Sequence, residues 1–127
     1  PKKYKYHSRI DETIVALNKV MPFDLHILDG LIVYGSHTSK LRLVMASRDP
    51  VAMDAVASII MRVNPKSVKH IMLADEEGLG ESSFTVKGIE VEYFRRRYPK
   101  IKLSKKILAL GYKVVCALGL DNRLVMV

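Results

Sequence analysis

Three carboxylates and one histidine are the residues of this chain whose types and positions best fit a chemical role. Asp29 follows an apolar run, His37 lies in the polar loop after it, and Asp49 and Asp54 stand at the start of an apolar segment with helical spacing. Carboxylate oxygens are the usual ligands of hard cations such as Mg²⁺, and imidazole titrates close to neutral pH. These residues predict a site for a divalent cation or a polar small molecule, and they leave open whether the protein is an enzyme.

Each of the three carboxylates also has a structural explanation. Asp49 precedes Pro50 and fits the N-cap of a helix, where its side chain accepts from the unpaired N–H groups of the first turn. Asp29 precedes Gly30, a pair that is typical of turns. Asp54 lies about 140° around the helix from Asp49 at roughly 100° per residue, so the two side chains need not converge. The sequence therefore leaves the structural and the functional interpretation of these residues both open.

A second candidate site is the basic stretch near the C-terminus. Residues 95–106 hold seven cations and no acid, whereas Lys and Arg balance Asp and Glu over residues 1–94. Such a strip could bind the phosphates of a nucleic acid, an acidic partner or an anionic lipid surface, or it could simply face water. The alternative function is a nucleic-acid or acidic-partner binding module, with weak and non-specific binding, through Arg95, Arg96, Arg97, Lys100, Lys102, Lys105 and Lys106.

The composition excludes several classes of protein. The single cysteine, Cys116, permits neither an internal disulfide nor an iron–sulfur cluster held by one chain, and it favours a reducing cytoplasm. No run of about 18 apolar residues is present, so no membrane span is expected. Gln is absent and Asn occurs only three times, which favours a thermophilic source. The chain lacks an initiating Met, which either processing of the protein or its being a piece of a longer protein would explain.

Alternating helical and extended segments are expected to position these residues. Local signals predict a helix over residues 8–21, strands over 25–28, 31–34 and 41–45, and helices over 49–63 and 64–77. Residues 84–91 are predicted to be an edge strand or hairpin, and residues 104–118 a last amphipathic helix.

The fold class follows from this alternation and from the apolar runs on either side of Asp29 and Gly30. Both runs are apolar on both faces, which suits strands buried on both sides better than a half-exposed hairpin. We therefore predict one small α/β domain over residues 1–127, with a layered, mostly parallel sheet and helices on both faces. Ligands of such sheets bind beyond the carboxyl ends of the strands, where Asp29 and Asp49 are expected.

Several of these residues together resemble a known family. The run Ser47-Arg48-Asp49-Pro50-Val51-Ala52-Met53-Asp54-Ala55, with Asp29-Gly30 before it and Gly78-Leu79-Gly80 and Gly88-Ile89-Glu90-Val91 after it, resembles the prokaryotic family called domain of unknown function 362. The resemblance runs over residues 7–91. It implies that the chain is the C-terminal portion of a longer family domain, with a missing N-terminal portion or a ferredoxin-like module as partner. The loop after Asp29-Gly30 is shorter here than in the family, and no ferredoxin cysteines are present.

Overall fold

The structure is a computed structural model that describes residue 6 and residues 9–100. Its elements are α2 (Ile10–Val20), β1 (His26–Tyr34), β2 (Thr38–Ser47), α3 (Pro50–Ile60), the 3-10 helix η1 (Pro65–Ser67), α4 (Lys69–Glu76) and α5 (Val91–Arg97). The predicted helix over residues 104–118 lies outside the described residues, as do Cys116 and part of the basic stretch. The described part of the chain contains both helices and strands, as predicted, and none of its helices is long and apolar enough to cross a membrane.

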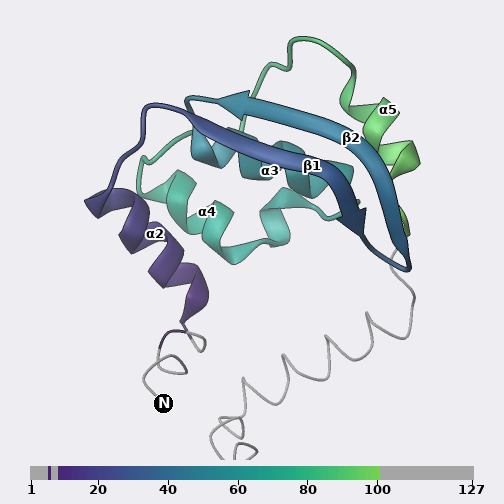
Figure 1. Cartoon of the computed structure of the whole chain (residues 1–127). Helices are drawn as coiled ribbons and strands as arrows, with labels where there is room; N and C mark the ends of the chain where they lie inside the picture. Colours follow the sequence, from purple (N-terminus) through teal and green to yellow (C-terminus); the bar gives the residue numbers. More distant parts are fainter. Residues whose placement is uncertain (1–5, 7–8, 101–127) are drawn as a thin grey trace, which may run out of the picture.

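The two described strands form one antiparallel hairpin that lies over α3 (Figure 1). Their register runs from His26 opposite Ser47 to Tyr34 opposite Thr38, with one irregularity between Gly30 and Ile32. The described helices gather on one face of this hairpin, and α2 packs beside α4 on that side (Figure 1). The predicted mostly parallel sheet with helices on both faces is therefore wrong.

The apolar runs around Asp29 belong to one strand that is buried on a single face, and not to strands buried on both faces. In the structure β1 continues through Asp29 and Gly30, and the chain reverses only at residues 35–37. Gly30 faces Leu43 so closely that an added Cβ would lie 3.2 Å from the Leu43 Cβ. The outer apolar side chains of the hairpin stay exposed instead of being covered: they include Ile27, Leu31, Ile32, Tyr34 and Val44.

The core lies between the inner face of β2, α3 and α5. Its buried members are Leu41, Leu43, Val56, Ile60, Phe94 and Tyr98. The Tyr98 hydroxyl donates to the Tyr34 carbonyl at 3.0 Å, and the Ser36 amide donates to the Lys100 carbonyl at 3.0 Å. These two bonds fasten the segment after α5 to the turn end of the hairpin.

The predicted strand or hairpin over residues 84–91 is also wrong. Residues 81–90 form an irregular loop, which we call the cover loop, and α5 begins at Val91. The described sheet contains only β1 and β2, so Phe84 and Val86 belong to no strand, and their side chains are 38% and 42% exposed. The cover loop arches past β2 and leads into α5 (Figure 1).

Candidate functional site

Asp49 caps α3 and holds the start of the cover loop. Its Oδ1 accepts from the Ala52 amide at 2.9 Å, which confirms the predicted N-cap, and its Oδ2 accepts from the Glu81 amide at 2.8 Å. Its own amide donates to the Ser47 Oγ at 3.0 Å. An added Cβ on Gly80 would lie 2.1 Å from the Asp49 Oδ1, so only glycine permits this approach of the loop. Asp49 therefore joins the end of β2, the start of α3 and the cover loop.

Asp54 does not converge with Asp49; its carboxylate lies near a histidine on another helix. The Asp54 Oδ2 lies 3.6 Å from the His70 Nε2, and the Asp11 Oδ1 lies 3.2 Å from the His70 Nδ1. A neutral imidazole has only one N–H donor, so it cannot donate to both carboxylates at once. Burial raises the pKa of Asp54 above its ordinary value, and the nearby His70 and His26 only partly offset that rise. The contact of Asp11, His70 and Asp54 links α2, α4 and α3.

The raised pKa predicts how the charge of Asp54 affects stability. Because the folded state holds the Asp54 proton more tightly than the unfolded state, stability falls as the pH rises through the interval above 3.8. Ionisation of the Asp54 side chain is therefore expected to cost stability. We expect Asp54→Asn to raise the melting temperature at pH 7 and to lose that advantage near pH 3.8, as measured by thermal denaturation at both pH values.

The matched control for this prediction is Asp24→Asn, because Asp24 is exposed and has no described hydrogen-bond or ion-pair partner. It should leave the melting temperature nearly unchanged at both pH values. A lower melting temperature for Asp54→Asn at pH 7 would show that attraction to His70 outweighs the cost of burying the carboxylate.

The structure does not bring the four predicted ligands together. Asp29 lies on the exposed face of β1, where its Oδ1 accepts from the Leu31 amide at 2.7 Å. His37 lies in the turn of the hairpin, with its Nδ1 3.0 Å from the Ser36 Oγ. Over residues 6 and 9–100, no three His, Cys, Asp or Glu side chains group closely enough to hold a metal ion. A cation site on Asp29, His37, Asp49 and Asp54 stays a prediction.

Part of the basic stretch lies on α5, and its described arginines have local partners. Glu92 pairs with Arg95 at 3.1 Å and with Arg96 at 3.2 Å. The Arg97 guanidinium lies 5.2 Å from the centre of the Tyr93 ring. Lys100 is exposed, whereas Lys102, Lys105 and Lys106 lie outside the described residues. Binding of a nucleic acid or an acidic partner by this stretch stays a prediction.

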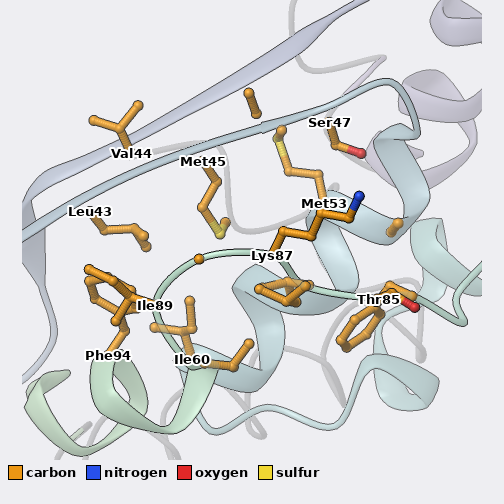
Figure 2. Close-up of a pocket in the computed structure, with 17 residues that line it drawn as sticks. Leu43, Val44, Met45, Ser47, Met53, Ile60, Thr85, Lys87, Ile89 and Phe94 are labelled. Carbon is orange, nitrogen blue, oxygen red and sulfur yellow. The ribbon is translucent and has the colours of Figure 1, made fainter.

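The structure adds a cavity that the sequence did not predict. It has a volume of about 490 Å³, is partly open, and lies between β2, α3, the cover loop and the first turn of α5 (Figure 2). Most of the side chains that line it are apolar, and they include Met45, Met53, Val56, Ile60, Phe84 and Phe94. The available signal was the apolar spacing of Phe84, Val86 and Ile89, which indicated a strand rather than a loop over a cavity.

Three polar side chains join this apolar lining. Ser47 comes from the end of β2, and Thr85 and Lys87 come from the cover loop (Figure 2). Ser47 also accepts the hydrogen bond from the Asp49 amide, so the N-cap of α3 adjoins one end of the cavity. The same Asp49 side chain fixes Glu81 at the start of the cover loop. The aspartate selected from the sequence thus positions parts of the cavity wall, although it is not itself among the residues that line it.

Comparison with known proteins gives one match. No curated protein and no solved structure matches the chain. Residues 1–58 match a family described as "Domain of unknown function (DUF362)", and this stretch includes Asp29-Gly30 and the start of α3 up to Asp54. The resemblance predicted from the sequence is therefore confirmed: over residues 1–58 this chain is similar to DUF362.

Proposed function

We propose that this domain binds a small, largely apolar molecule in the cavity between β2, α3 and the cover loop. The observation that supports the proposal is the cavity itself, with a volume of about 490 Å³. Ligand sites are typically concave, mostly apolar, and about 300–1,000 Å³ in volume, with a few polar groups that orient the ligand. The apolar lining with Ser47, Thr85 and Lys87 fits this description.

A cavity of this size is unusual beside a packed core. Protein interiors are close-packed, with few voids larger than a water molecule, because an empty space forfeits contacts along its walls. The wall formed by the cover loop is incompletely buried, since Phe84 is 38% and Ile89 is 61% exposed. An apolar ligand would fill the space and bury part of these side chains, and this burial would favour binding.

The proposal keeps the predicted class of function, small-molecule binding, and moves it away from the four residues first selected. Of those, Asp49 is connected to the cavity through its hydrogen bonds to Ser47 and Glu81, as a positioning residue. We also propose the reducing cytoplasm as the location, because the sequence has a single cysteine, Cys116, and so no internal disulfide.

A neutral apolar fluorophore tests the proposal directly. We expect N-phenyl-1-naphthylamine to bind the chain with one saturable site and to fluoresce more strongly when bound. Ala52 lines the cavity, so Ala52→Phe should fill part of the space and weaken binding by roughly tenfold, which corresponds to about 1.4 kcal/mol.

The control addresses the other apolar surface of the domain. Ile32 is 65% exposed on the outer face of the hairpin, so Ile32→Ser should leave the affinity for the fluorophore unchanged. If Ile32→Ser weakens binding and Ala52→Phe does not, the fluorophore binds the outer face of the hairpin and the cavity is not the ligand site.

A further inference from the structure

We infer that the ligand of this cavity is an amphiphilic carboxylate, with its apolar tail inside and its carboxylate at Lys87. This inference rests on the proposed function and adds the class of ligand to it. Among the described residues that line the cavity, Lys87 alone is charged. A single cation at the edge of an apolar space distinguishes an anionic amphiphile from a neutral or cationic one of the same shape.

Lys87 has no acidic partner in the described part of the chain. The ion pairs found there join other residues, and no carboxylate lies within 4.0 Å of the Lys87 ammonium. Glu81, at the start of the same loop, accepts from the Ser83 hydroxyl at 3.1 Å. The Lys87 charge is therefore available to an anion that comes from solution.

The polar groups of the cavity are arranged so that one end can hold a head group. In Figure 2 the Lys87 side chain extends from the cover loop toward the end of the cavity where Ser47 lies. A carboxylate there could accept from the ammonium, and charge-assisted hydrogen bonds of this kind are stronger than neutral ones. The Ser47 hydroxyl already accepts from the Asp49 amide, and its own proton remains available as a donor to an anion.

The opposite part of the cavity suits an apolar tail. Leu43, Ile60, Ile89 and Phe94 gather there and carry no polar side-chain atom (Figure 2). Met45 lies between this end and Lys87, and Met53 lies beside Lys87 (Figure 2); unbranched methionine side chains adapt to different tail shapes. The lining therefore favours a flexible aliphatic chain over a rigid polar ligand.

The cover loop provides a route for such a ligand to enter. The start of the cover loop is held by the bond from the Glu81 amide to the Asp49 carboxylate. At the end of the loop the Glu90 carbonyl accepts from the Tyr93 amide. Between these two points, residues 82–89 make no backbone–backbone hydrogen bonds with the described residues. A segment without such bonds opens at low free-energy cost, so the loop can move while its ends stay in place.

Competition between two ligands with the same tail tests the inference. Dodecanoate and dodecanol should both displace bound N-phenyl-1-naphthylamine, and dodecanoate should do so at a roughly three- to tenfold lower concentration at neutral pH. The difference is expected to be modest because Lys87 is exposed, so an ion pair between its ammonium and the ligand carboxylate contributes little. Lys87→Met keeps an apolar side chain of similar length and removes the charge. This variant should abolish the preference, so that dodecanoate and dodecanol displace the fluorophore at similar concentrations.

A matched control uses a cation away from the cavity. Lys66 is exposed and does not line the cavity, so Lys66→Met should keep the preference for dodecanoate. If the two ligands compete equally in the unaltered chain, or if Lys87→Met retains the preference, the assignment of a carboxylate ligand is wrong while binding in the cavity stands. If the fluorophore does not bind in the cavity at all, the proposed function itself fails.

Discussion

Replacing Leu41 with alanine is expected to lower the free energy of unfolding by about 2–5 kcal/mol, the range observed for large-to-small changes in packed cores. Leu41 is 3% exposed and belongs to the cluster with Val56, Ile60, Phe94 and Tyr98. The substitution removes apolar contacts and leaves a void beneath the hairpin that the neighbouring helices fill only in part. Urea denaturation followed by circular dichroism measures the loss, provided that the slope of the transition stays constant.

The matched control lies three residues further along the same strand, on its other face. Val44 is 62% exposed, so Val44→Ala should change the free energy of unfolding by less than about 0.5 kcal/mol. The two variants together test the one-sided hairpin. A sheet covered on both faces would lose stability in both variants, and an equal loss of about 2 kcal/mol or more would contradict the fold described here.

The helices were predictable because their signals are local. Asp49 followed by Pro50 predicted the start of α3, and the structure confirms both the cap and the proline in the first turn. The single helix predicted over residues 64–77 is divided in the structure into η1 and α4, although the Asn64 Oδ1 does accept from the Lys66 amide at the start of η1. Each signal involves atoms within about three residues of one another, so the prediction needs no knowledge of the rest of the chain.

The sheet was not predictable in the same way, because its arrangement depends on contacts distant in sequence. The turn of the hairpin is held by the Lys100 carbonyl, which accepts from the Ser36 amide across 64 residues. The Pro99 carbonyl oxygen packs so close to Gly35 that an added Cβ there would lie 2.3 Å from it. The apolar outer face also gave a misleading signal. Ile27 and Ile32 are apolar but exposed, so the pattern typical of a strand buried on both faces appears in a strand buried on one.

In the candidate site, too, the local features were predictable and the long-range contacts were not. Asp49 could be selected from the sequence because capping is local, although its second hydrogen bond, to the Glu81 amide, could not. The cavity joins residues 43–60 to residues 84–94, which no local pattern brings together. No pattern in the sequence indicates Lys87 as a ligand-binding residue, since a single lysine in an exposed segment is usually solvated.

Asp49→Ala is the second change with a large expected effect, because one side chain makes two separate bonds to backbone amides. Loss of the N-cap should lower the free energy of unfolding by about 0.5–2 kcal/mol. Loss of the bond to the Glu81 amide should remove a further 0.5–1.5 kcal/mol, approximately. Asn64→Ala offers a comparison, because Asn64 caps the exposed η1 and its side chain makes no second described bond.

Asp49→Ser separates the two roles of this aspartate. Serine is a good N-cap, so the bond to the Ala52 amide should survive, but its single short hydroxyl cannot also reach the Glu81 amide. Asp49→Ser should therefore lose only about 0.5–1.5 kcal/mol of stability. In this variant the Glu81 amide should exchange with solvent deuterium faster than in the unaltered chain. The amides of α3 should exchange as slowly as they do in the unaltered chain. If Asp49→Ser and Asp49→Ala are equally destabilised and neither changes the exchange of the Glu81 amide, Asp49 does not hold the cover loop. Its contribution would then end at the start of α3.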